Sequence, residues 1–298
     1  MTITITGNEL PMNTVEAAAI LLSGHPDFRV LKRISCAADL ALPALGDDGP
    51  LKIGVAVDIE TTGLDSSNDA VVELAVQRFK FDGQGRIVEV GLPRSWLQDP
   101  GFPLEPEITR ITSLTDADLQ GQAIDDVAAC NLLNSADLVV AHNAGFDRGF
   151  VEVRLPAASG LQWACSMAGV AWHDLGFEGR SQSALLMQAG WFYTAHRAEA
   201  DVAALLHLLA HVCKDGDTVL SKVVASAERT TVRVEAHGIA FEMKDVLKLR
   251  GYRWNATQKC WWTEVDEGDL VAEQLWLQRR GYNRSPTLTH LTARERYL

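Results

Sequence analysis

The sequence predicts an α/β protein built on a mixed sheet, followed by a small α+β module. Three strand-like segments follow one another directly, at residues 53–59, 71–79 and 86–92. A further strand at residues 138–141 then alternates with helical segments, and this order of elements is typical of a mixed α/β sheet. A second, shorter set of strand and helix patterns begins after residue 226, which indicates a separate module.

The elements of the main domain follow from local patterns. The first strand is apolar and β-branched, which predicts a buried position. The next two strands are joined by the turn Asp82-Gly83-Gln84-Gly85, so the three are expected to be antiparallel neighbours. The strand at residues 138–141 is short and wholly apolar, which predicts the centre of the sheet. Helices are expected at residues 124–133, 146–153, 181–188 and 197–213.

Three regions are expected along the chain. Residues 1–50 form an N-terminal helical extension, with a helix over residues 14–22. Residues 51–213 form the α/β domain, and residues 226–285 form the small module. In the module, strands at 231–235 and 260–265 alternate with helices at 244–250 and 270–280. The polar residues 214–230 are expected to contain the domain boundary, and the tail after Tyr282 is expected to fray.

Composition limits the classes of protein that remain. The 298 residues carry a net charge of −12, with 47% hydrophobic and 22% charged residues, which excludes wholesale disorder. No apolar run is long enough for a membrane span, and no secretory signal is evident. Five scattered cysteines predict reduced thiols and a cytoplasmic location.

The charge is distributed unevenly. Residues 51–213 hold 10 basic and 21 acidic side chains, whereas residues 214–298 hold 14 basic and 12 acidic ones. The overall charge argues against a protein that coats nucleic acid through a basic surface. It leaves open an enzyme whose carboxylates hold metal ions against phosphates.

Asp58 and Glu60 are the first candidates for such chemistry. They lie two residues apart at the carboxyl end of the first predicted strand, so their side chains share one face. Two carboxylates on one face of a buried strand repel each other and are costly to desolvate. Because the flanking sequence offers no cations for a structural salt bridge, a divalent metal site explains the pair better.

Asp147 and Asp201 each fall in or near the first turn of a predicted helix. Asp147 ends the segment His142-Asn143-Ala144-Gly145-Phe146-Asp147, which follows the strand at residues 138–141, and Asp201 ends the segment that begins at His196. Taken singly, each acid could merely complement its helix dipole, and His196 could be an ordinary loop histidine. Together, and in this order along the chain, the three acidic segments are stronger evidence for a functional site than any one of them alone.

The three segments resemble the motifs of the DEDD superfamily of 3′-to-5′ exonucleases. Residues 58–64 have the D-x-E-T-T-G-L form, residues 142–147 the H-N-x-x-F-D form and residues 196–201 the H-x-x-x-x-D form. The last spacing marks the DEDDh branch, which includes the proofreading subunit (epsilon) of bacterial DNA polymerase III. Residues 111–119 also resemble the I-T-G-I-T-x-x-x-L stretch of epsilon-like chains. The resemblance covers about residues 52–213.

This resemblance implies an RNase H-like fold, with a five-stranded mixed sheet flanked by helices. It also implies that Asp58, Glu60, Asp147 and Asp201 hold two divalent ions, Mg²⁺ or Mn²⁺, for which carboxylate oxygens are suitable ligands. His196 is the expected general base of a two-metal mechanism, and the products are nucleoside 5′-monophosphates.

Five further residues match positions that lie near the terminal nucleotide in the family. Thr61 and Thr62 correspond to backbone and hydroxyl contacts near the 3′-hydroxyl. Leu64 corresponds to an apolar wedge against the terminal base. Asn143 and Phe146 correspond to positions that flank the site.

The C-terminal module combines cations with aromatic side chains. Residues 244–259 hold five basic side chains and one acidic side chain, a net charge of +4. They loosely resemble small K-x-x-G-x-x-W modules appended to nucleic-acid enzymes. Cations for phosphates and aromatic faces for bases suit single-strand binding, and the candidate contacts are Lys248, Arg250, Arg253, Trp254, Lys259 and Trp262. A pure protein-docking role is the alternative.

These features predict a metal-dependent 3′-to-5′ exonuclease that acts on single-stranded or frayed DNA. A replication or repair protein is a further expected partner, and no membrane is involved. Within the same class, an exoribonuclease is the alternative, because no residue that reads a 2′-hydroxyl can be identified. A non-catalytic nucleic-acid adaptor on a nuclease fold is the alternative from a different class, and the intact catalytic set argues against it.

Overall fold

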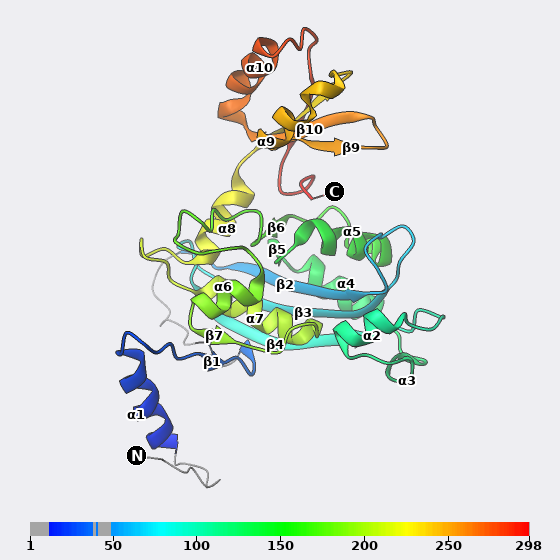
Figure 1. Cartoon of the computed structure of the whole chain (residues 1–298). Coiled ribbons are helices and arrows are strands. Elements are labelled where there is room, and N and C mark those ends of the chain that lie inside the picture. Colours follow the sequence, from blue (N-terminus) through cyan, green and yellow to red (C-terminus); the bar gives the residue numbers. More distant parts are fainter. Residues whose placement is uncertain (1–11, 38–39, 41–48, 298) are drawn as a thin grey trace.

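The structure is a computed structural model that describes residues 12–37, 40 and 49–297 (Figure 1). The helix expected in the N-terminal extension is α1 (Met12–Ser23). After it, β1 (Lys32–Arg33) pairs in parallel with β7 (Trp191–Phe192), and Ile34 is buried in the core of the main domain. The remaining parts of the predicted extension, residues 1–11, 38–39 and 41–48, lie outside the described residues.

The main sheet has five strands in the order β4-β3-β2-β5-β6. The antiparallel part consists of β2 (Lys52–Thr61), β3 (Val71–Phe81) and β4 (Ile87–Leu97). The parallel part adds β5 (Leu138–Ala141) and β6 (Trp163–Cys165) beside β2. The predicted mixed five-stranded sheet is therefore confirmed. The expected central position of residues 138–141 is wrong, because only β6 of the described strands lies beyond β5 and the central strand is β2, although β5 is fully buried.

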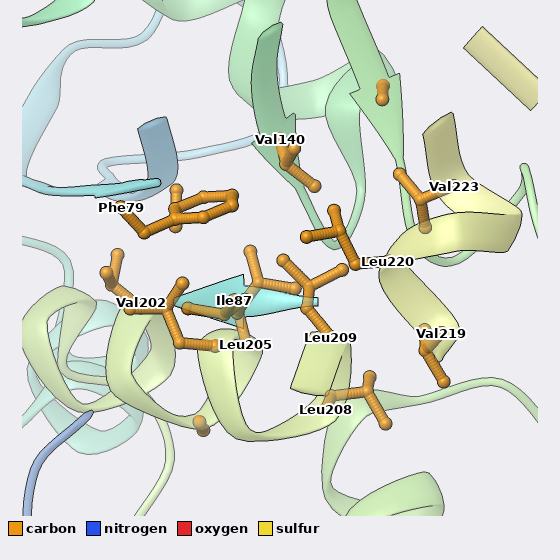
Figure 2. Close-up of a cluster of buried hydrophobic side chains, with 14 of the residues drawn as sticks. Phe79, Ile87, Val140, Val202, Leu205, Leu208, Leu209, Val219, Leu220 and Val223 are labelled. Atoms are coloured by element: carbon orange, nitrogen blue, oxygen red, sulfur yellow. The ribbon is translucent and has the colours of Figure 1, made fainter. Parts of the chain in front are cut away.

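Helices cover both faces of this sheet. On one face, α4 (Asp126–Asn134) and α5 (Ala144–Arg154) pack against a buried apolar cluster that includes Val55 and Val57 of β2. On the other face lie α6 (Gln182–Gln188), α7 (Ala198–Ala210) and α8 (Val219–Glu228). Figure 2 shows side chains of α7 and α8 meeting Phe79 and Val140 of the sheet. No helix among the described residues has the length and apolar content needed to cross a membrane.

Two short helices complete the domain, and several elements escape the sequence patterns, among them the first of these two helices, β6 and α8. α2 (Pro106–Thr112) and α3 (Asp116–Leu119) follow β4 and contribute to a small apolar cluster against β3. β6 was missed because three residues are too few for a periodic pattern. α8 was missed because polar residues separate its buried Val219, Leu220 and Val223, which nevertheless fall on one helix face and join the core.

The C-terminal module is a four-stranded antiparallel sheet in the order β11-β8-β10-β9. Its strands are β8 (Thr231–His237), β9 (Arg253–Asn255), β10 (Cys260–Asp266) and β11 (Thr287–Leu291). α9 (Lys244–Leu249) and α10 (Leu270–Arg279) pack on one face of this sheet, around Trp261. The expectation of a frayed tail is wrong, because the tail forms β11 by pairing with the distant β8.

The residues after β11 return to the main domain. The backbone N–H of Trp163 donates to the carbonyl of Ala293 at 2.8 Å, so the tail extends the β6 edge of the main sheet. The guanidinium of Arg148 on α5 is fully buried and donates to the carbonyls of Arg294 and Arg296 at 2.5 and 2.7 Å. The C-terminal tail is therefore bound to α5 as well as to the module.

Candidate active site

The four carboxylates predicted to bind metal come together from three elements. Asp58 and Glu60 lie on the face of β2 that meets α7, Asp147 lies in the first turn of α5, and Asp201 lies in the first turn of α7. The carboxylate oxygens of Asp58, Glu60 and Asp201 lie within 4.8 Å of one another. Asp147 is only 3% exposed and repels both Asp58 and Asp201 electrostatically.

Burial and mutual repulsion make these acids reluctant to ionise. Burial, reinforced by the nearby Asp201, raises the pKa of Glu60 to about 8. Burial raises the pKa of Asp147 to about 7, although backbone N–H groups that donate to it oppose the rise. Burial and four neighbouring acids, Asp147, Asp201, Glu60 and Glu73, raise the pKa of Asp58 well above its usual range. Such a cluster is unfavourable at neutral pH unless a cation offsets its charge.

Three donors hold the carboxylate of Asp201 in place. The hydroxyl of Tyr193 donates to Oδ1 at 2.7 Å, and the backbone N–H groups of His196 and Arg197 donate to Oδ2 at 2.8 and 3.2 Å. Gln182 donates to both the Tyr193 hydroxyl and the Asp201 carbonyl, at 3.1 and 2.9 Å. These bonds fix the direction of the carboxylate. Sequence patterns missed Tyr193 and Gln182, because neither lies in a recognisable motif.

His196 lies immediately before α7, with its backbone in the left-handed region (φ 69°). The residue is exposed, and its positive charge, when protonated, lowers the pKa of Asp201. Its imidazole has no hydrogen-bond partner among the residues that the structure describes. The ring is therefore available to a substrate bound at the carboxylates.

A fifth carboxylate, that of Glu73 on β3, lies beside the cluster. Glu73 pairs with Glu60 in the β2–β3 register and is 1% exposed. Arg197 Nε lies 3.1 Å from its Oε2, and the backbone N–H of Ala198 donates to the same oxygen at 3.2 Å. This ion pair neutralises Glu73 and anchors the start of α7. An acid within an apolar strand is the sequence signal that could have identified it.

The segment after β2 carries three predicted substrate contacts. The Thr61 hydroxyl donates to the carbonyl of Gly63 at 2.5 Å, and the Thr62 hydroxyl accepts a backbone N–H at 2.9 Å. A Cβ on Gly63 would lie 2.4 Å from the Asp69 carboxylate, so glycine is required for this close approach. Leu64 is 87% exposed, as an apolar wedge for a nucleobase would be.

Asn143 and Phe146 open α5 beside Asp147. The Asn143 side chain is exposed and makes no capping hydrogen bond, whereas Phe146 is partly buried on the apolar core. The neighbouring His142 has both ring nitrogens engaged, each at 2.8 Å, by the Ser166 hydroxyl and the Arg180 carbonyl. Burial lowers the pKa of His142 to about 4, so this ring is neutral at pH 7 and holds the loop before α6.

The predicted contacts of the C-terminal module do not share one surface. Trp262 and Arg253 are register partners on the sheet face opposite α9 and α10, and the Arg253 guanidinium lies 5.4 Å from the Trp262 ring centroid. Arg233, which was not predicted, lies 4.7 Å from the same ring. Trp254 instead lies beside the core residue Trp261, with ring centroids 5.5 Å apart.

The remaining three predicted contacts are on other parts of the module. Arg250 Nη2 forms an ion pair with the buried Glu273 carboxylate at 2.9 Å. This side chain therefore stabilises the module itself. Lys248 is exposed on α9, and Lys259 is exposed in the turn between β9 and β10. Of the six candidates, only Arg253 and Trp262 form a common surface.

The chemistry of the acidic cluster suits divalent cations. Among the described residues, no Lys or Arg lies within 4.0 Å of the carboxylates of Asp58, Glu60, Asp147 or Asp201. Every candidate donor is a carboxylate oxygen, the ligand that hard ions such as Mg²⁺ prefer. The residues present therefore fit the ions that the sequence motifs imply.

Fold and site together define an α/β protein with an acidic centre on its sheet, whose carboxylates suit divalent cations. Residues 55–172 match the family model described as exonuclease. This match and the mixed five-stranded sheet agree with the exonuclease class that the motifs predicted for this part of the chain.

Two curated relatives illustrate the extent of the similarity. The PolC-type DNA polymerase III of Clostridium perfringens is 35% identical over 103 residues, which is 34% of this chain and 7% of that protein. The PolC-type DNA polymerase III of Streptococcus pyogenes is 37% identical over 101 residues, 33% of this chain and 6% of that protein. This chain therefore matches only a small part of the length of these relatives.

Two solved structures are also similar. Exonuclease X in complex with 5′ overhanging duplex DNA shares 24% identity, with a TM-score of 0.42, and the match covers 58% of this chain and 99% of that chain. Exonuclease I of E. coli in complex with a dA16 oligonucleotide shares 17% identity, with a TM-score of 0.45, and the match covers 82% and 64%.

Proposed function

We propose that this protein is a metal-dependent 3′-to-5′ exonuclease of the DEDDh branch that removes nucleoside 5′-monophosphates from single-stranded or frayed 3′ ends of DNA. The observation that carries the proposal is the group of four carboxylates, Asp58, Glu60, Asp147 and Asp201, which have no Lys or Arg within 4.0 Å among the described residues. Two divalent ions, Mg²⁺ or Mn²⁺, would supply Lewis-acid stabilisation of charge on the phosphate.

The chain's own residues supply positioning and proton transfer. The hydroxyl of Tyr193 and the backbone N–H groups of His196 and Arg197, just before α7, orient the Asp201 carboxylate. The accessible imidazole of His196 accepts the proton of the attacking water, since histidine is the side chain that most often acts as a general base. Leu64 packs against the terminal base and separates it from the next one, which favours an unpaired 3′ end.

A nuclease assay tests this function. Purified protein with Mg²⁺ or Mn²⁺ is expected to release mononucleotides from single-stranded DNA labelled at its 3′-terminal nucleotide. Asp58→Ala is expected to lower kcat/KM by about a thousandfold, because several kcal/mol of transition-state stabilisation are lost. Asp174→Ala, which removes an exposed acid outside the cluster, is the matched control. Equal rates for wild type and Asp58→Ala on both DNA and RNA would overturn the proposal.

DNA is proposed as the preferred substrate, with RNA as the alternative. The identified relatives are DNA polymerases, and this similarity favours DNA. Parallel assays on DNA and RNA strands of identical sequence decide between the two. A higher kcat/KM on RNA would replace the exodeoxyribonuclease with an exoribonuclease.

We also propose that the C-terminal module contributes to substrate binding through its outer sheet face, defined here as the surface around Trp262, Arg253 and Arg233. A tryptophan face between two guanidinium groups combines base stacking with phosphate attraction. We place the start of the module after α8, because α8 is part of the main hydrophobic core. Trp262→Ala is expected to raise KM about tenfold with little change in kcat, whereas Trp254→Ala should have a smaller effect. An unchanged KM for Trp262→Ala favours a protein partner instead.

Two further observations bear on the location of the protein and on a further protein partner. All five cysteines are free thiols, which suits a reducing compartment such as the cytoplasm. The similarity to replicative polymerases supports a replication or repair protein as a further partner. Affinity purification of the chain with an intact outer sheet face, compared with Trp262→Ala, tests whether that surface recruits such a protein.

A further inference from the structure

A second group of metal-ligating side chains lies in the C-terminal module. Glu235 and His237 are two residues apart on β8, so they share one face of the sheet. Cys260, the first residue of β10, is the direct register partner of His237. One ligand atom from each of the three side chains lies within 4.8 Å of the other two. The group therefore combines a carboxylate, an imidazole and a thiol across two adjacent strands.

Among the described residues, the only hydrogen bond of these three side chains joins Cys260 Sγ to Gln258 Oε1, at 3.8 Å. They lie on the sheet face opposite the module's hydrophobic core, and none of them belongs to that core. The Glu235 side chain is only 13% exposed, yet within the described residues no Lys or Arg lies within 4.0 Å of it. The nearest basic atom is His237 Nε2, at 3.9 Å. A shielded carboxylate without a cation is costly, and a bound cation would remove that cost.

We propose that Glu235, His237 and Cys260 form a zinc site, separate from the acidic cluster of the nuclease domain. Sulfur and nitrogen ligands favour zinc over Mg²⁺ or Mn²⁺, whereas the all-oxygen cluster has the opposite preference. Three protein ligands leave one position of a tetrahedral ion for water or a further ligand. Binding releases the thiol proton of Cys260 to solvent, because the thiolate is the ligand.

A zinc ion at this site would constrain the geometry of the outer sheet face. Glu235 is the register partner of Trp262 on β10, and His237 is the partner of Cys260. An ion held by both strands would fix β8 against β10 directly beside Trp262. Zinc binding by these three side chains does not require nuclease activity.

Cobalt substitution tests the zinc site in the full-length chain. Co²⁺ bound to a thiolate gives near-ultraviolet charge-transfer absorption that carboxylate-bound Co²⁺ does not give. The titration is expected to saturate at one equivalent, and Zn²⁺ should abolish the absorption by displacing Co²⁺. Cys260→Ser is expected to remove the absorption, and His237→Ala and Glu235→Gln should weaken the apparent Co²⁺ affinity at least tenfold.

Two control variants test whether a different thiol or histidine binds the ion. Cys165→Ser removes the thiol that lies near Asp147 and should leave the absorption intact. His290→Ala removes a histidine that lies 3.6 Å from Glu267 in the same module and should have no effect. Circular dichroism establishes that each variant is folded, and Glu235→Gln provides a near-isosteric test if Cys260→Ser is unstable. Absence of the absorption in the wild type, or its survival in folded Cys260→Ser, overturns the proposal.

Discussion

Asp201 shows how much of a site can depend on residues outside its motif. Both of its oxygens accept hydrogen bonds, one from Tyr193 and the other from backbone groups at the start of α7. The carboxylate is thus oriented before any cation arrives. Partners that orient a metal ligand commonly change affinity or activity by factors of about 10 to 100 when they are removed.

Replacing Tyr193 with phenylalanine tests this orienting role. Tyr193→Phe removes one hydroxyl and preserves the ring, so activity at low Mg²⁺ is expected to fall about 10- to 100-fold. Saturating Mg²⁺ should restore part of the loss, because the missing group acts through Asp201. A Mg²⁺ titration of the initial rate measures the effect. Tyr297→Phe, at another buried tyrosine, is the control, and equal Mg²⁺ dependence of the two variants contradicts the role.

The role of His196 leads to a different prediction, because its imidazole makes no hydrogen bond to any described residue. His196→Ala is expected to lower kcat about 100- to 10,000-fold, the usual contribution of a general base. The protein's stability should be almost unchanged, since the backbone N–H that donates to Asp201 is retained. Single-turnover rates and thermal melts measure the two quantities. A large loss of stability would assign a structural role to this histidine.

At the level of elements, the site depends on how α7 meets the sheet. The ion pair between Glu73 and Arg197, with the hydrogen bond from Ala198 to Glu73, fixes the first turn of α7 against β3. That contact places Asp201 opposite the carboxylates of β2. The packing therefore creates a concentration of negative charge that no single element contains.

This concentration of charge makes stability depend on pH and metal together. The pKa of Glu60 rises from 4.5 to about 8 and that of Asp147 from 3.8 to about 7 on folding without metal, so the folded state binds these protons more tightly than the unfolded state. Their contribution to the free energy of unfolding is therefore lost as pH rises through this range. Divalent cations bind best at the higher pH values, where these carboxylates have lost their protons. We expect Mg²⁺ to raise Tm by several degrees more at pH 8 than at pH 5.5, as measured by calorimetry against EDTA.

Glu60→Gln is the matched control for that measurement. The amide cannot ionise, so the metal-free variant should lose less stability than the wild type between pH 5.5 and pH 8. Its Tm should also respond less to Mg²⁺. If Mg²⁺ stabilises the wild type equally at both pH values, the raised pKa values of the cluster do not govern the metal response.

At the scale of the whole molecule, the C-terminal tail joins the module to the catalytic helix. Arg148, adjacent to Asp147, binds two tail carbonyls and forms an ion pair with Glu152 at 2.8 Å. Arg296, 4% exposed, donates from the tail to the carbonyls of Ser226 and Arg229 at 2.8 and 2.6 Å. The tail is therefore a structural link between the end of α8, the module and α5 (Figure 1).

Arg148→Ala tests the link. Loss of one partner from a buried ion pair is expected to cost about 3–5 kcal/mol, because Glu152 and the tail carbonyls lose their donor. Activity should fall as well, since α5 carries Asp147. Denaturant unfolding and limited proteolysis of the tail measure the effect. Arg294→Ala removes an exposed contact to the carbonyl of Gly160 and should cost at most about 1 kcal/mol. Similar losses in both variants contradict a special role for Arg148.

The sequence by itself determined the local features of this protein. Apolar alternation located β2, β3 and β5, and the spacing of Asp58 and Glu60 placed both on one strand face, since these patterns depend on backbone geometry alone. The ordered motifs indicated the exonuclease class, which the family comparison confirmed. They also selected Asp147, His196 and Asp201 as site residues, and that role stays a prediction.

Only the tertiary structure decided what depends on distant pairing. Tyr193, Glu73 and Arg148 acquire their roles from partners on other elements, and a sequence pattern carries no information about such contacts. The tail forms β11 because it pairs with the edge of the distant strand β8. In the C-terminal module Trp261 is buried and Trp262 faces outward, because adjacent residues of a strand point to opposite faces of the sheet. Local sequence sets which elements form, whereas packing between them determines which side chains meet.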